Sequence, residues 1–271
     1  MDISNMPDQQ IKNNTGQSHE DNSYHSLSSY QPRTYRHWVK NKDLITFSVI
    51  VEETDCNISA VTRLESKARK SILKHRAIIK KYISSHPLFL TTLTPFTVEA
   101  DAPLIIQAMA EAGKKASVGP MAAIAGAIAQ FTGEELSQYT PELIIENGGD
   151  IYLHSSKNRT IGIFAGDSPL SGKIGLEIAG KNTPIGISTS SGTVGHSLSF
   201  GRADAVVVLA ENAVLADAVA TGAGNLVLTP SDIPRCIEYA GSIPGVKGIV
   251  IIKGEDLGAW GAVEFRTIGT E

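Results

Sequence analysis

Residues 144–153 read Ile-Ile-Glu-Asn-Gly-Gly-Asp-Ile-Tyr-Leu and place two strand-like runs on either side of Asn147-Gly148. Asn-Gly between apolar runs is a strong signal for a tight antiparallel hairpin. Outward from it, apolar patterns predict further strands over 44–51, 56–61, 160–165, 173–178, 205–210, 248–252 and 262–265, and helices over 62–85, from 103, from 120, over 214–222 and over 231–240. These elements mix without strict strand-helix-strand alternation. The sequence therefore predicts an α+β fold, a mixed or antiparallel sheet with helices packed on it.

The composition describes a globular chain of 271 residues with a polar beginning. Residues 1–32 hold almost no apolar side chains and predict a disordered tail, which leaves a single α+β domain over residues 33–271. The net charge of −4 argues against general nucleic-acid binding. An apolar run long enough to span a bilayer and a signal-peptide plan are both lacking, so we expect a cytoplasmic protein without membrane contact. Whether it forms a homo-oligomer stays open.

Residues 188–193 form a polar run, Ser-Thr-Ser-Ser-Gly-Thr, after the apolar Ile185-Gly186-Ile187. Small residues let a backbone approach closely, so hydroxyls and backbone N–H groups there can converge on one anion. A phosphate is the expected guest. A flexible linker is the alternative, although a loose loop inside the domain would have little structural purpose.

Asp217 and Thr221 lie four residues apart in an Ala-rich helix, so they share one of its faces. Two hard oxygen ligands on one face suit Mg²⁺. The structural alternative is a helical aspartate beside a threonine that bonds its own backbone. Because an unpaired carboxylate in an apolar helix is costly to bury, Asp217 needs a partner in either case.

Other residues suggest further roles. His196 can serve as a general acid or base, although a single loop histidine is more often structural. The run Gly195 to Ser199 is similar to a nucleophile elbow but ends in Ser where Gly is expected, which makes a serine hydrolase a weak alternative. Gly149-Asp150 offers close backbone approach and a carboxylate at a strand end.

The helix predicted over 62–85 carries a basic side, with Arg63, Lys67, Arg69, Lys70, Lys74, Arg76, Lys80 and Lys81. This side could bind RNA or an acidic partner, but a solvated charged face is the more common case. The cysteines, Cys56 and Cys236, are far apart without a nearby second ligand, so we expect inert thiols.

Four segments together resemble the uncharacterised ApbE-related protein family: Val118-Gly119-Pro120-Met121-Ala122-Ala123, Glu146-Asn147-Gly148-Gly149-Asp150, Thr189-Ser190-Ser191-Gly192-Thr193-Val194-Gly195-His196 and Leu215-Ala216-Asp217-Ala218. That family is distantly similar to the FAD:protein FMN transferases, which use Mg²⁺ to cleave FAD and attach FMN to a threonine. The resemblance implies a flavin-nucleotide site and a metal held by Asp217 and Thr221. The cofactor-binding residues it implies are Gly119, Asn147, Gly148, Gly149, Asp150, Thr189, Ser190, Ser191, Gly192 and Thr193.

The chain also departs from the transferases. Their H-I-I-D-P segment appears only as His196-Ser197-Leu198-Ser199-Phe200, and the lysine of their small-residue helix is replaced by Gly126 or a neighbour. Two hypotheses follow. The first is a Mg²⁺-dependent enzyme acting on a phosphorylated ligand such as FAD or FMN, by flavin transfer or FAD pyrophosphatase-type chemistry. The second is a non-catalytic ligand- or partner-binding module on the same scaffold.

Overall fold

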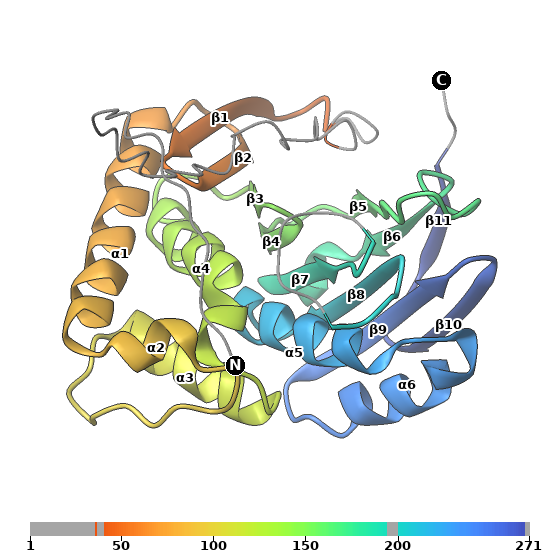
Figure 1. The fold of residues 1–271 in the computed structure, drawn as a ribbon. Helices are drawn as coiled ribbons and strands as arrows, with labels where there is room; N and C mark the ends of the chain where they lie inside the picture. Colours follow the sequence, from red (N-terminus) through yellow and green to blue (C-terminus); the bar gives the residue numbers. More distant parts are fainter. Residues whose placement is uncertain (1–35, 37–40, 194–199, 269–271) are drawn as a thin grey trace, which may run out of the picture. The chain divides into compact units, whose positions relative to one another are not determined.

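The computed structural model describes residue 36, residues 41–193 and residues 200–268, which belong to the unit spanning residues 33–271. An eight-stranded sheet organises them, in the order β1-β2-β3-β4-β7-β8-β9-β10, with each neighbouring pair antiparallel (Figure 1). Its strands are β1 (Ile45–Val51), β2 (Thr54–Ala60), β3 (Leu143–Asn147), β4 (Asp150–His154), β7 (Ile185–Ser190), β8 (Ala205–Ala210), β9 (Val246–Lys253) and β10 (Asp256–Gly261). A second sheet has the order β11-β6-β5, formed by β11 (Phe265–Thr267), β6 (Ile174–Ile178) and β5 (Arg159–Gly162).

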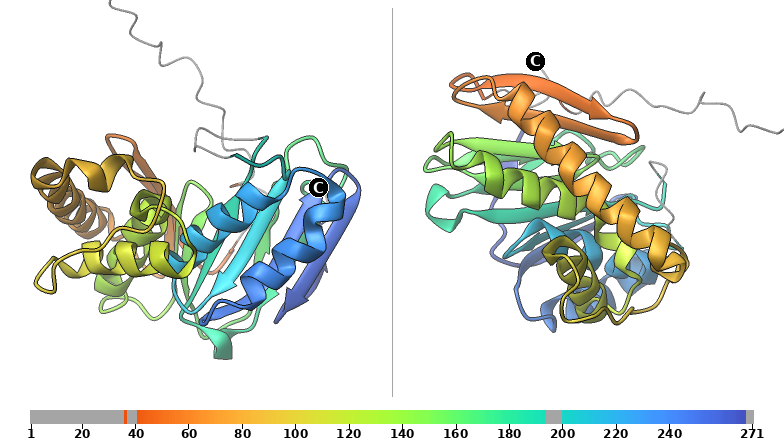
Figure 2. Two further views of the ribbon diagram at one scale, coloured as in Figure 1. Left: turned by 60° about the horizontal axis from the view of Figure 1, so that its bottom comes forward. Right: turned by 90° about the vertical axis from the view of Figure 1, so that its left-hand side faces the viewer.

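The helices cover one face of the large sheet. They are α1 (Glu65–Ser85), α2 (Pro87–Thr91), α3 (Leu104–Lys115), α4 (Ile124–Leu136), α5 (Ala213–Leu226) and α6 (Ile233–Gly241), with short 3-10 helices η2 (Pro120–Ala123), η3 (Gly180–Asn182) and η4 (Pro230–Asp232). Figure 2 shows α5 and α6 side by side on the sheet, with α5 against β7 and β8 and α6 against β9 and β10. The α+β class, the antiparallel pairing and the helices on the sheet are confirmed.

Two hydrophobic cores explain this layering. One lies between the helices and the large sheet, and the other lies between the large sheet and β5 and β6. All six residues of β8 are buried because side chains on both of its faces enter a core. The alternating exposure of β1 instead follows from a strand with one buried face.

Two glycines let α5 lie close to its neighbours. A Cβ at Gly186 of β7 would lie 2.1 Å from the backbone carbon of Asn212, where α5 begins. A Cβ at Gly126 of α4 would lie 2.2 Å from the carbonyl oxygen of Ala213. Side chains are excluded at both points, so the first turns of α5 are held tightly between β7 and α4.

A buried ion-pair network ties the chain before β1 to the end of β4. Arg159 Nη2 donates to Glu142 Oε2 at 2.7 Å, and its Nη1 donates to Asp43 Oδ1 at 2.7 Å. The Glu142 carboxylate also accepts from the backbone N–H of Ser156 at 3.0 Å and from the hydroxyls of Ser155 and Ser156. Burial alone would raise the pKa of Glu142, but these hydrogen bonds and Arg159 lower it to about 2.

This network predicts a specific acid sensitivity. A carboxylate whose pKa is depressed by folding stabilises the native state above its unfolded pKa, and the contribution is lost as pH falls toward the folded pKa. Glu142 should therefore contribute on the order of 2 kcal/mol at neutral pH that disappears between about pH 5 and pH 2. Urea unfolding at several pH values should show a smaller loss over this window in Glu142→Gln than in the unsubstituted protein. Equal losses in the two proteins would contradict the assignment.

Candidate active site

The candidate site lies where β4, β7, α4 and α5 meet. Asp150 begins β4 directly after the Gly148-Gly149 turn, and it pairs in register with Ser188 of β7. Asp217 projects from α5, close enough to Asp150 for a side-chain hydrogen bond between the two carboxyl groups. The structure thus brings together two carboxylates that the sequence assigned to separate groups, one for the cofactor and one for the metal.

Each carboxylate has further hydrogen bonds. Ser188 Oγ donates to Asp150 Oδ1 at 2.5 Å, and both side chains are almost fully buried. The backbone N–H of Gly126 donates to Asp217 Oδ2 at 2.8 Å, and that of Ala125 donates to the same carboxyl group. These amides belong to the first turn of α4, whose N-cap residue, Ala123, has no side-chain acceptor to offer. Asp217 therefore caps α4 from the neighbouring helix.

The electrostatics of this pair are unusual. Burial and the negative charge of Asp150 raise the pKa of Asp217 well above the usual range of an aspartic acid, although the two α4 amides oppose the shift. Two carboxylates this close cannot both ionise easily unless a proton or a cation lies with them. The pair therefore shares a proton or holds a cation.

Thr221 lies one turn beyond Asp217 on α5 and is half-buried. Its position on the same side of the helix follows from the four-residue spacing. Ser188 was predicted as part of the phosphate-binding run 188–193, but not as a partner of Asp150. The alternation of side chains along a strand was the signal that could have found this contact, because it places Ser188 and Ser190 together on the face toward α5.

The Gly-Gly turn is fixed on several sides. Gly148 and Gly149 have φ values of 71° and 107°, which favour glycine. Asn147 Nδ2 donates to the carbonyl oxygen of Ala125 at 3.1 Å, and Thr189 N donates to the carbonyl oxygen of Gly149 at 3.1 Å. The turn consequently links the start of α4 to β7, beside the carboxylate pair.

The polar run 188–193 is only partly a turn. Its first three residues complete strand β7, so Thr189 lies on the sheet face opposite Ser188 and Ser190. Beyond the strand, Gly192 N donates to the carbonyl oxygen of Ala203 at 2.9 Å, and Thr193 Oγ1 donates to Asp204 Oδ1 at 3.3 Å. Ser191 Oγ accepts from Thr193 N at 3.1 Å. These bonds give residues 191–193 a defined conformation rather than that of a loose linker.

Two predicted residues stand apart from this geometry. Gly119 packs against α2, because a Cβ there would lie 2.0 Å from the carbonyl oxygen of Thr92. That close approach explains the glycine without a ligand, and its cofactor role stays a prediction. His196 and the predicted tail over residues 1–32 lie outside the described residues.

Part of the basic side of α1 is paired with acidic side chains. Arg76 contacts Glu52 and Glu53 at 2.5 Å each, Lys80 also pairs with Glu52, and Lys74 contacts Glu135 at 2.6 Å. Lys67 lies over the ring of Tyr139, 4.0 Å from its centroid. Charges with such partners favour a solvated, structural face over an RNA-binding surface.

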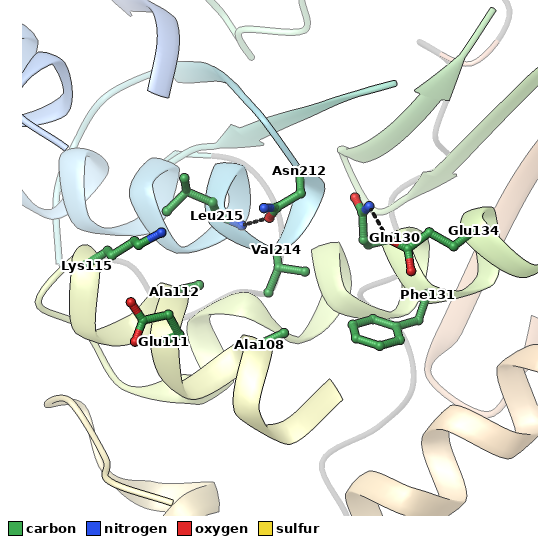
Figure 3. Close-up of a pocket in the computed structure, with 10 residues that line it drawn as sticks. All are labelled: Ala108, Glu111, Ala112, Lys115, Gln130, Phe131, Glu134, Asn212, Val214 and Leu215. Carbon is green, nitrogen blue, oxygen red and sulfur yellow. Dashed lines mark hydrogen bonds between the residues drawn. The ribbon is translucent and has the colours of Figure 1, made fainter. Parts of the chain in front are cut away.

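A cavity of about 200 Å³ opens between α3, α4 and the start of α5 (Figure 3). It is separate from the predicted site residues, and much of its wall is apolar, including Ala108, Ala112, Phe131, Val214 and Leu215. At its edge Gln130 Oε1 accepts from Ala213 N at 2.8 Å, one turn from Gly126 on α4 and one turn from Asp217 on α5. The cavity and the carboxylate pair thus lie on successive turns of the same two helices.

Among the residues that the structure describes, no group of three or more His, Cys, Asp or Glu side chains lies close enough together to hold a metal ion. The helices among them are also too short or too polar to cross a membrane.

Cys56 and Cys236 are both buried free thiols, and burial raises the pKa of Cys236 to about 11.

Comparison with known proteins places the chain in a family. Residues 36–240 match the family model described as AbpE bacteria. A UPF0280 protein of Methanococcus aeolicus is 43% identical over 81% of this chain and 91% of its own length. The UPF0280 protein of Methanocaldococcus jannaschii is 39% identical, over 79% of this chain and 90% of its own.

Solved structures with some likeness include the flavin transferase ApbE from Vibrio cholerae, with 13% identity and a TM-score of 0.46, covering 80% of this chain and 96% of that one. An ApbE protein from Thermotoga maritima has 12% identity and a TM-score of 0.49, covering 79% and 96% respectively. By its sequence relatives and the family model, the chain belongs to the uncharacterised, ApbE-related UPF0280 family.

Proposed function

We propose that the protein binds a flavin nucleotide, or a closely similar phosphorylated ligand, together with Mg²⁺ at the Asp150–Asp217 pair. One observation carries the proposal: two carboxylates share a confined site at the first turn of α4, beside a glycine turn. Glycines admit a phosphate close to the backbone, and a cation held by the two carboxylates would bind its oxygen atoms. The family resemblance supplies the flavin part of the proposal.

The residues present fit a magnesium ion. Asp150, Asp217, Ser188 and Thr221 offer hard oxygen atoms. Burial first and the charge of Asp150 second raise the pKa of Asp217, and a cation would compensate that charge. Two carboxylates suffice, because Mg²⁺ is commonly held by one or two of them together with phosphate oxygens of the substrate. When bound, the ion would neutralise phosphate charge during transfer. The chain's own groups hold the site in shape, through the α4 amides and Ser188.

The chemistry proposed at this site is cleavage of the FAD pyrophosphate. A hydroxyl oxygen of a protein acceptor, or of water, attacks the phosphorus of the FMN half. The bond from that phosphorus to the AMP oxygen breaks, AMP leaves with the bonding electrons, and the hydroxyl proton passes to a base. His196 is the proposed base because its imidazole titrates near neutral pH.

Calorimetric titration with FAD, FMN and ADP, each with and without Mg²⁺, tests the binding proposal. We expect saturable binding that requires Mg²⁺ for at least one of the flavin nucleotides. Absence of binding to all three would contradict the proposed function.

Incubation with FAD and Mg²⁺, followed by assay of FMN and AMP, then separates an enzyme from a binding module. Turnover that disappears in His196→Ala would establish the enzyme, whereas binding without turnover would favour the module.

A further inference from the structure

Arg36, which precedes the first strand, is held by acidic groups of β2 and β3. Its Nε donates to Glu146 Oε2 at 2.6 Å. Its Nη1 lies 3.1 Å from both carboxylate oxygens of Asp55, and its Nη2 donates to the Asp55 carbonyl oxygen at 2.8 Å. The Arg36 side chain is only 11% exposed, so the guanidinium is a largely buried charge with partners on each nitrogen.

The Glu146 carboxylate connects this charge to the glycine turn. While Oε2 contacts Arg36, Oε1 accepts from the backbone N–H of Gly149 at 2.9 Å. Gly149 has a φ of 107° and follows Gly148 at 71°. This left-handed backbone is easily distorted without an external bond, because glycine has the widest conformational freedom of any residue.

The same turn determines where Asp150 lies. Gly149 is its direct neighbour in sequence, and the Gly149 carbonyl oxygen is fixed by Thr189 N on β7. Hydrogen bonds from the N–H of Gly149 and to its carbonyl oxygen therefore set the direction in which the chain enters β4. Asp150 faces Asp217 from that position.

We propose that Arg36 and Glu146 are positioning residues that hold the Gly148-Gly149 turn and, through it, Asp150 for the metal-bound ligand. The inference rests on the proposed function above. The alternative is that the Arg36 contacts only anchor the preceding chain to the sheet. The two differ in the role of Glu146, because its carboxylate binds Arg36 at 2.6 Å and also accepts from Gly149 N, whereas the Asp55 carboxylate lies 3.1 Å from Arg36.

The test compares Glu146→Ala and Arg36→Met with Asp55→Asn as the matched control. Outer groups that orient metal ligands typically change affinity by about 10- to 100-fold when removed. Glu146→Ala and Arg36→Met should weaken Mg²⁺-dependent FAD binding, measured by calorimetry, by at least about tenfold. Asp55→Asn loses part of the same ion pair and should keep its affinity within about threefold. Arg36→Lys retains the charge without the planar guanidinium, so its FAD affinity should lie between those of Arg36→Met and Asp55→Asn.

A second readout needs no ligand. Hydrogen exchange in peptides covering residues 143–154, followed by mass spectrometry, should accelerate in Glu146→Ala and stay near that of the unsubstituted protein in Asp55→Asn. The inference would be overturned if Glu146→Ala kept the FAD affinity and the exchange rates of the unsubstituted protein. It would also be overturned if Asp55→Asn lost as much affinity as Glu146→Ala and exchanged as fast. If the unsubstituted protein binds no flavin nucleotide while its exchange pattern responds as expected, the proposed function fails and the turn-holding contact stands as a structural one.

Discussion

Asp217→Asn should abolish Mg²⁺-dependent ligand binding while the protein remains folded. Asparagine keeps a side-chain oxygen that accepts from the Gly126 and Ala125 amides, so the cap on α4 survives the substitution. It removes the negative charge that a cation would need. In EDTA, its unfolding free energy should equal or exceed that of the unsubstituted protein, because the repulsion with Asp150 disappears.

Thermal and urea unfolding with and without FAD and Mg²⁺ measure this effect. At a free ligand concentration of about 100 times Kd, binding stabilises a protein by about 2.7 kcal/mol, and the variant should lose all of this gain. Asp256→Asn, the same substitution at an exposed position of β10, serves as the control and should keep it. A folded Asp217→Asn protein that is still stabilised by FAD and Mg²⁺ would refute the metal assignment. Asp217→Ala is a poorer test, because it also leaves the α4 amides without their acceptor.

Gly186→Ala should cost about 3 kcal/mol or more of unfolding free energy. The added Cβ would lie 2.1 Å from the carbon and 2.3 Å from the carbonyl oxygen of Asn212, and 2.2 Å from the nitrogen of Ala213. These are backbone atoms, so a rotamer change cannot relieve the clash. The start of α5 would have to move away from β7, and Asp217, one turn further along, would move with it.

The control for this variant is Gly241→Ala at the end of α6. There a Cβ would meet the Trp260 ring at 3.4 Å, an ordinary contact distance. Alanine is the better helix former, so this variant should match or exceed the unsubstituted stability by up to about 1 kcal/mol. Urea unfolding of both variants decides the matter. A loss below about 1 kcal/mol in Gly186→Ala would show that the contact between β7 and α5 is more yielding than the structure indicates.

Most of the fold follows from local patterns. The Asn-Gly hairpin, the amphipathic α1 and the apolar β8 all carry strong periodic or turn signals, and each appears close to its expected place. Helix α2 was missed because five residues are too short to display a period. Strand β10 was missed because it is an exposed, glycine-containing edge strand, and the strand predicted over 262–265 is wrong, since β10 ends at Gly261 and β11 begins at Phe265.

The candidate site depended on long-range contacts. Asp150 and Asp217 are 67 residues apart in sequence, and their meeting requires β4, β7 and α5 to be packed first. Local pattern could single out each carboxylate but could not pair them. The Glu146 contact was equally hidden, because a strand glutamate beside a turn looks like an ordinary surface residue until Arg36 is placed next to it.

The contacts of Arg36 have a practical consequence for anyone who shortens the chain for biochemical work. Strand β1 begins at Ile45, so a protein trimmed to start a few residues before it would retain β1 to β11 and α1 to α6. Such a protein would lack the guanidinium between Asp55 and Glu146 and would leave those two buried acids without it. Trimming should therefore stop upstream of Arg36, and loss of activity in a shorter version would say nothing about the intact protein.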